Sequence, residues 1–186
     1  MADQDNQDWV KAYLELVEII KEKVPEVRWQ DLWMEQTSQE GVEYPFATPA
    51  VFYQFDTNDI VNKGENEQDL HVYVTVLLAL DTVADSHDGS LNQEHALRFG
   101  GIMRQIHKAF HGRAGVHFSK LTRVAIRKEV APPYVQLYSQ TYATVITDMG
   151  ATPVYLPHEM TADQHQAEKG KAPLPAGPPF FEVPFP

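Results

Sequence analysis

The sequence predicts an α+β domain, residues 1–150, in which an antiparallel sheet of about five strands carries two helices on one face. Residues 70–80, LHVYVTVLLAL, alternate as a strand does, and both of their faces are apolar toward the end of the run, which favours a central strand. Two helical segments are amphipathic. The predicted order, α-β-β-β-α-β-β, lacks the regular strand–helix alternation of a parallel doubly wound fold.

Residues 7–24 are expected to form the first helix. Their apolar side chains recur at three- and four-residue spacing, with charged side chains between them. The apolar positions are Trp9, Val10, Tyr13, Leu14, Val17, Ile20 and Val24. Asp5, Asn6 and Asp8 are suitable caps, and Pro25 ends the helix because proline lacks a backbone N–H.

Three strands are expected next. The first includes Trp29 and Trp33, which fall on alternate positions, and the second runs over residues 50–55 with Pro49 at its start. A polar connection, residues 56–69, leads to the third strand, residues 70–80. On that strand one face is formed by Val72, Val74, Val76 and Leu78.

The second helix is expected over residues 92–111. Its apolar stripe is Ala96, Phe99, Met103, Ile106 and Phe110. Gly100 and Gly101 each cost a helix about 1 kcal/mol relative to alanine. They predict either a close approach of this helix to the sheet or a kink. Gly112 is placed to end the helix.

The last two strands are expected to form a hairpin whose connection contains Pro132 and Pro133. In the fourth strand Val124, Ile126 and Val130 alternate. In the fifth, one face has Val135, Leu137, Ala143 and Val145, and the other has Tyr134, Tyr138 and Tyr142.

Residues 151–186 are expected to form an extended C-terminal arm, because they contain eight prolines. The arm ends in four apolar residues, Phe180, Phe181, Val183 and Phe185. Such a segment gains order only by lying on other surfaces. We expect it to wrap its own domain or to lie on a neighbouring subunit.

The amino-acid composition excludes several classes of protein and of functional site. The chain has no cysteine, which excludes a disulfide scaffold, a thiolate metal site and a cysteine nucleophile, and which fits a reducing compartment. Its polar, acidic start does not resemble a signal peptide. No apolar run reaches the ~20 residues that span a bilayer, so no membrane partner is expected.

Charge is distributed unevenly along the chain. Residues 1–99 hold 20 acids and 6 bases, whereas residues 100–186 hold 6 acids and 9 bases, and the net charge is −11. Eight bases lie without an intervening acid at Arg98, Arg104, Lys108, Arg113, Lys120, Arg123, Arg127 and Lys128. A molecule with one acidic and one basic surface can associate head to tail with copies of itself. Two solvated faces without a specific role are the alternative, and direct DNA binding is disfavoured by the net charge.

Candidate chemistry is sparse. His107 and His111 lie four residues apart on the predicted helix, with His117 beyond, so a small metal-binding domain is one alternative. The simpler interpretation is that these histidines complement the negative end of the helix dipole. No phosphate-binding loop, dinucleotide fingerprint or nucleophile elbow occurs. We therefore predict no catalytic residue, no metal and no cofactor.

In order and texture, residues 7–148 resemble the tail-terminator and tail-completion proteins of long-tailed bacteriophages and related injection machines. The resemblance lies in VPEVRWQDLW after the first helix, then YPFATPAVFYQF, LHVYVTVLLAL, ALRFGGIMRQIHKAF and FSKLTRVAIRKEV. The proline-rich arm departs from the compact pattern of that family. A neck or head-completion connector of the same assembly therefore remains an alternative.

The resemblance implies a non-enzymatic virion subunit that is assembled in the bacterial cytoplasm. Such subunits typically form a homo-hexameric ring at the head-proximal end of a tail tube, stop tube polymerisation and join the tail to the neck or head. DNA would pass only transiently through the channel. For the contacts we expect the basic residues Arg113, Lys120, Arg123 and Arg127 and the arm residues Phe180, Phe181, Val183 and Phe185.

Overall fold

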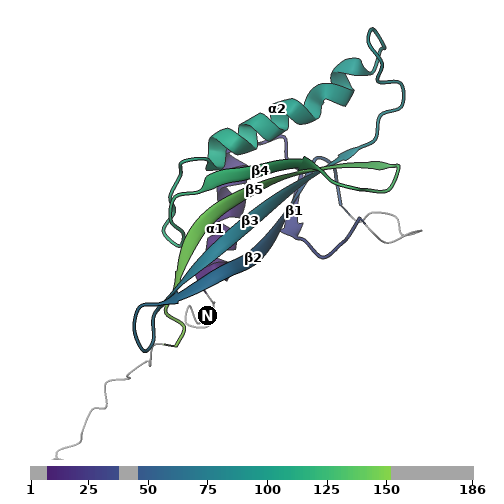
Figure 1. Cartoon of the computed structure of the whole chain (residues 1–186). Helices are drawn as coiled ribbons and strands as arrows, with labels where there is room; N and C mark the ends of the chain where they lie inside the picture. The colour runs from purple at the N-terminus through teal and green to yellow at the C-terminus, as the bar shows by residue number, and fades with distance from the viewer. Residues whose placement is uncertain (1–7, 38–45, 152–186) are drawn as a thin grey trace, which may run out of the picture. The chain divides into compact units, whose positions relative to one another are not determined.

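The computed structural model describes residues 8–37 and 46–151 and confirms the α+β fold (Figure 1). Its elements are α1 (Asp8–Lys23), β1 (Trp29–Leu32), β2 (Ala50–Asn62), β3 (Gln68–Asp81), α2 (Gln93–Phe110), β4 (Thr122–Lys128) and β5 (Val135–Asp148). Neither helix combines the length and hydrophobicity that crossing a bilayer requires. The predicted caps Asp5 and Asn6 and the arm, residues 152–186, lie outside the described residues.

The five strands form one sheet in the order β1-β2-β3-β5-β4, with β3 at its centre as predicted. Strands β2, β3, β5 and β4 are antiparallel to their neighbours, but β1 pairs with β2 in parallel. The prediction of a purely antiparallel sheet was therefore wrong at β1. The chain between Leu32 and Ala50 is long enough to return to the starting end of the sheet, which a parallel pair requires.

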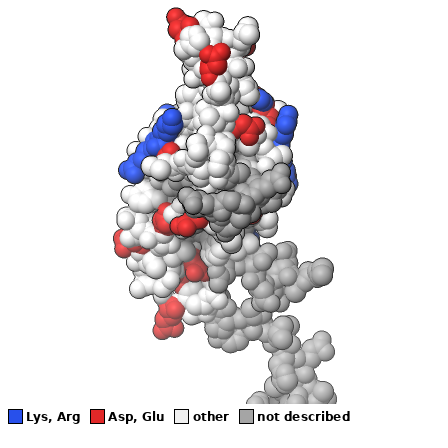
Figure 2. Space-filling view, turned by 90° about the vertical axis from the view of Figure 1, so that its right-hand side faces the viewer, with Lys and Arg blue, Asp and Glu red and all other residues white. Residues whose placement is uncertain are grey.

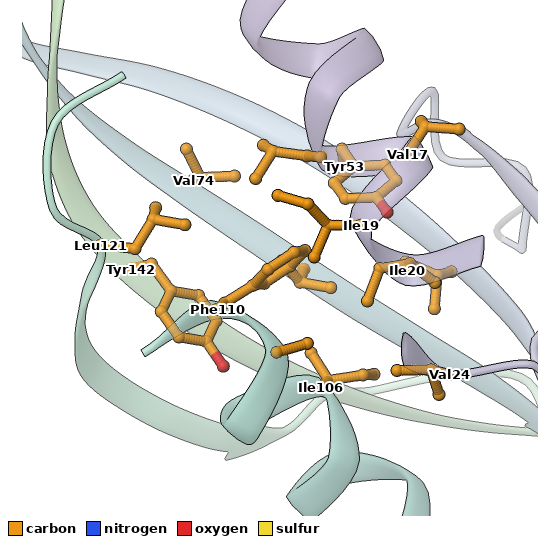
Figure 3. Packing of buried hydrophobic residues seen from close by; sticks show 14 of the residues in the cluster. Val17, Ile19, Ile20, Val24, Tyr53, Val74, Ile106, Phe110, Leu121 and Tyr142 are labelled. Atoms are coloured by element: carbon orange, nitrogen blue, oxygen red, sulfur yellow. The ribbon is translucent and has the colours of Figure 1, made fainter. Parts of the chain in front are cut away.

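Both helices cover the same face of the sheet, as predicted. The main core lies between the two helices and that face of the sheet (Figure 3). Leu16 and Ile20 of α1 and Ile106 and Phe110 of α2 are fully buried there. The sheet meets them with alternate residues: Val51, Tyr53, Val72, Val74, Val76, Leu78, Tyr142 and Ile146. Burial of a large aliphatic or aromatic side chain contributes about 1.5–3 kcal/mol, so this layer dominates the stability of the domain.

Among the described residues, those on the opposite face of the sheet form a buried cluster at one end. There, Phe52 packs edge-on against Phe46 and Trp33, with ring centroids 5.0 and 5.6 Å apart. Leu77 and Leu137 complete this smaller cluster. Farther along the same face, Tyr73 is 37% exposed.

The region predicted as a polar connection, residues 56–69, is instead strand and turn. β2 continues to Asn62, β3 begins at Gln68, and the two pair throughout, with a bulge between Thr57 and Asp59. This part of the hairpin has mostly exposed side chains on both faces. Because no face is buried there, the sequence lacks the apolar alternation that marks a half-buried strand.

Within α2 the buried stripe differs from the prediction at its beginning. Ala96 and Phe99 are only partly buried, whereas Ile102 and Ala109 are buried with Met103, Ile106 and Phe110. A methyl group at Gly100 or Gly101 would meet no atom within 4 Å, so the expected close approach to the sheet was wrong. The chain does leave α2 at Gly112, whose φ of 82° suits glycine.

The predicted fourth strand is confirmed as β4, but its alternating apolar residues are not buried. Val124 and Ile126 are 54% and 56% exposed, and Val130, beyond the strand, is fully exposed. β4 is the outermost strand of the described sheet, and a bulge between Arg123 and Ala125 interrupts its pairing with β5. The alternating aliphatic residues of β4 are therefore exposed, because the strand lies at the edge of the described sheet.

Candidate protein–protein interface

The lysines and arginines of the basic stretch are distributed over α2, the connection that follows it, and β4. Among the described residues, Arg98 alone of these eight bases forms an ion pair, with Glu26 at 2.9 Å. The other seven form no salt bridge within the described part of the chain, although Arg113 lies near enough to Glu22 to lower its pKa after the larger effect of Lys23. Figure 2, a view from the right-hand side of Figure 1, shows basic side chains in two groups on the flanks and acidic ones at the top and lower left.

The connection between α2 and β4 is held in a defined shape. The N–H of Gly112 donates to the carbonyl of Leu121 and the N–H of Leu121 donates to the carbonyl of Arg113, both at 2.8 Å. Leu121 and Phe118 are buried and anchor the segment in the core. Arg113 and Lys120 are therefore held side by side at the surface.

Glu15 of α1 fixes the tip of this connection. Its carboxylate accepts hydrogen bonds from the N–H groups of Val116 at 3.0 Å and His117 at 3.2 Å. Gly115 has no room for a side chain, because a Cβ atom there would stand 2.5 Å from both Glu15 Oε1 and the ring of Phe118. The sequence analysis gave no role to Glu15 or Gly115, since their contact joins residues a hundred positions apart.

Arg123 is held by a buried polar network at the edge of the core. Its guanidinium donates to Gln140 Oε1 at 3.0 Å, which also accepts from the Tyr142 hydroxyl at 2.9 Å. Gln140 Nε2 donates to the carbonyl of Met103 at 2.8 Å. Burial raises the pKa of Tyr142, so its hydroxyl remains a donor.

His107 and His111 lie next to this network, with ring centroids 4.7 Å apart. His111 Nδ1 accepts the backbone N–H of Arg123 at 3.1 Å, whereas the buried Nδ1 of His107 has no hydrogen-bond partner. Burial lowers the pKa of His107, and the charges of Arg123 and His111 lower it further. The imidazole of His107 is therefore neutral at pH 7.

The alternative of a metal site finds no third ligand here. No group of three or more histidine, aspartate or glutamate side chains with metal-binding geometry occurs among the described residues. His117 lies on the connection held by Glu15, beside a different hollow from the one that His111 lines. Arg123, close to His107, adds a positive charge that opposes a cation.

The four predicted basic contact residues do not form a single patch. Arg113, Lys120 and Arg123 lie around the α2–β4 connection. Arg127 is farther along β4, opposite Ser139, and faces the side of the sheet away from the helices. The predicted contacts at Phe180, Phe181, Val183 and Phe185 lie outside the described residues.

A second charged surface, which the sequence analysis missed, is the end of the β2–β3 hairpin. Residues 56–69 contain five acids and one base. Lys63 pairs with Asp69 at 2.9 Å, and this hydrogen bond lowers the pKa of Asp69 and raises that of Lys63. Asp56 and Asp59 form no ion pair within the described chain and remain exposed on β2.

One small hollow lies where α2 begins, lined in part by Arg28, Thr48, Asp81, His95 and Arg98. Its volume is about 200 Å³. Small-molecule sites usually have volumes of about 300–1,000 Å³. The Thr48 hydroxyl donates to Asp81 at 2.6 Å, so part of its polar lining is already satisfied.

The candidate site is thus a pair of oppositely charged surfaces, one at the end of the β2–β3 hairpin and one at β4 and the connection before it. In comparisons with known proteins, no family model matches this sequence, and no curated protein is significantly similar to it.

Proposed function

We propose that this protein is a structural, non-enzymatic subunit of a bacteriophage-type virion. In this proposal it forms a ring at the head-proximal end of the tail tube, ends tube polymerisation and offers a surface to the neck or head. Its partners are further copies of the same chain, the tail tube and the neck or head-completion proteins. DNA passes only transiently through the ring.

The observation that carries this proposal is the combination of the element order with the distribution of charge. The α-β-β-β-α-β-β order is the one that the resemblance to tail-terminator proteins implies. Seven bases along α2, the following connection and β4 form no salt bridge with any described residue, whereas the chain as a whole has a net charge of −11. Unpaired basic groups on an acidic protein suit head-to-tail contact between copies.

The experiment is deletion of the gene from the phage or prophage that carries it, followed by electron microscopy of the particles. For a terminator, we expect tails of uncontrolled length and heads without tails, because nothing stops the tube from growing. For a neck connector, the tails would have normal length and remain separate from the heads. Normal, infectious particles would contradict both roles, and a plasmid copy of the gene is the control.

A further inference from the structure

Strands β2 and β4 each have an outer side that no other strand of the described chain covers over most of its length, although the Arg123 N–H of β4 donates to His111 Nδ1. β1 covers only Ala50–Tyr53 of β2, so residues 54–62 have no strand on their outer side; we call these residues the acidic edge. On the other side of the sheet β4 pairs only with β5, and we call residues 122–128 the basic edge. In Figure 1 the two edges bound the sheet on opposite sides.

Each edge combines charge with exposed aliphatic side chains. On the acidic edge, Ile60 and Val61 are 52% and 44% exposed beside Asp56 and Asp59. On the basic edge, the exposed aliphatic residues are Val124 and Ile126. The basic residues beside them are Arg123, Arg127 and Lys128. An edge strand with exposed aliphatic residues and unpaired backbone groups is a template for pairing with another chain.

We propose that the acidic edge of one copy docks against the basic edge of the next copy. This inference rests on the proposed function, because it supplies the contact by which a ring would form. β2 is antiparallel to β3, β3 to β5 and β5 to β4, so β4 runs antiparallel to β2. A copy added in the same orientation therefore places its β2 antiparallel to β4 of its neighbour, and the sheet continues across the two subunits.

The signs of the charges favour this pairing over the alternatives. Charges and bulges on an edge strand commonly protect it from any association, and both edges have a bulge. Here, however, the two edges have opposite charges. Acidic against acidic and basic against basic pairings are repelled, while the mixed pairing is attracted. The charges thus select a head-to-tail contact, which closes as a ring or continues as a filament.

The register of the sheet adds a geometric consequence. Ala125, near the middle of the basic edge, is level with Gln54 through Thr141 and Thr75. Gln54 is the first residue of the acidic edge, whose middle lies four residues farther along β2. Neighbouring copies would therefore be stepped by ~13 Å along the strands. A stepped sheet closes only when its strands are inclined to the axis, as in a barrel.

The test uses charge reversal in the full chain, with molecular mass measured by sedimentation at increasing concentration. One variant carries Arg127→Glu and Lys128→Glu, and the other carries Asp56→Lys and Asp59→Lys. Each is expected to weaken self-association by about tenfold or more, because like charges then face each other. Combining all four substitutions in one chain is expected to restore association, since the charges are exchanged.

Mixing the two variants gives the sharper result. The two intact edges in the mixture are opposite in charge, and so are the two reversed edges, so the mixture is expected to associate under conditions in which each variant alone stays monomeric. The matched control is Lys21→Glu with Lys23→Glu, two exposed residues of α1, which changes net charge equally and is expected to leave the mass unchanged. Circular dichroism confirms that each variant is folded.

The failing outcomes separate this inference from the proposed function. A full chain that stays monomeric up to millimolar concentration overturns the edge contact. The edge contact is also overturned if the charge reversals leave the oligomer intact while removal of residues 172–186 dissociates it. If such an oligomer still completes tails in the gene-deletion strain, the proposed function stands without the edge contact. If the reversals abolish association but the deletion strain makes normal particles, the edge contact stands and the proposed function fails.

Discussion

Gln140 shows how one buried side chain joins the interior to the basic surface. Its amide oxygen is shared by Arg123 and Tyr142, and its amide nitrogen donates to Met103. We expect Gln140→Leu to lower the free energy of unfolding by about 1–3 kcal/mol, because it leaves the buried Tyr142 hydroxyl without its acceptor.

Urea denaturation of this variant measures the loss, and Tyr142→Phe is the companion variant. The combined loss is expected to be smaller than the sum of the two single losses, because the two residues share a hydrogen bond. A strictly additive result would contradict the coupling of the two side chains.

Gly115 and Gly100 make a matched pair, because one has no room for a side chain and the other has open space. We expect Gly115→Ala to destabilise the domain by about 1–3 kcal/mol, since its methyl group would overlap the buried Phe118 ring. Gly100→Ala is expected to stabilise it by about 1 kcal/mol, because alanine favours a helix interior. Thermal denaturation of the two variants should show midpoints on opposite sides of the natural protein. Equal midpoints would mean that Phe118 and Glu15 move aside.

His107 predicts a dependence of stability on pH. Its pKa in the folded protein is lowered by burial, and next by Arg123 and His111, from the ordinary 6.5. Between the lowered and the ordinary value the unfolded chain binds the proton more strongly. The contribution of His107 to stability is therefore complete above pH 6.5 and is lost as the pH falls through the lowered pKa.

Urea denaturation as a function of pH checks this expectation. His107→Gln should flatten the fall in stability below pH 6.5. An unchanged slope in His107→Gln would assign the fall to other groups.

Elements with one buried face were predictable, and elements without one were not. α1, β3 and the Tyr138 and Tyr142 face of β5 follow from periodicity, because each places alternate or three-to-four-spaced residues in or against the core; Tyr134, also predicted for that face, lies before the strand and is exposed. The outer half of β2 has no buried face, so its polar sequence resembled a loop. The parallel pairing of β1, four residues long, depends on a distant partner and leaves no local pattern.

The same reasoning explains what was missed at the candidate interface. The basic stretch could be identified from the sequence, because charged residues can be counted without knowing the fold. Its division between two faces of β4 follows from the register with β5, which appears only in the fold. The acidic edge could not be recognised, because residues 56–69 were predicted to be a polar connection and not part of two paired strands.

The β2–β3 hairpin should differ in local stability along its length. Val51–Tyr53 and Val74–Leu78 lie beneath the helices, whereas residues 57–62 extend beyond them and are exposed. We expect amide hydrogen exchange to be fast in residues 57–62, because local opening of these residues exposes little apolar surface. Exchange should be slow in the part of the hairpin beneath the helices. Mass spectrometry of exchanged peptides from a dilute sample measures this difference. Uniform protection to the tip in a monomeric sample would contradict it.

At the scale of the whole molecule, the described residues through Ala151 contain a continuous core, and chain contacts group residues 1–152 as one compact unit. The arm lies outside that unit, so a stop after residue 171 removes Phe180, Phe181, Val183 and Phe185 without touching the core. We expect the shortened chain to unfold cooperatively at the same temperature as the full chain, because all the residues of the two described core clusters lie before residue 152 and are kept.

The shortened chain is nevertheless expected to support tail completion poorly in the gene-deletion strain, because an apolar arm of this composition is suited to a neighbouring subunit. Calorimetry and particle counts measure the two effects separately. A lower unfolding temperature would mean that the arm folds onto its own domain, and the loss of tails would then follow from instability. Unchanged stability with normal tails would remove the arm from the assembly contacts and leave the sheet edges as the remaining candidate. The two measurements together thus decide whether the arm stabilises its own subunit or joins it to the next.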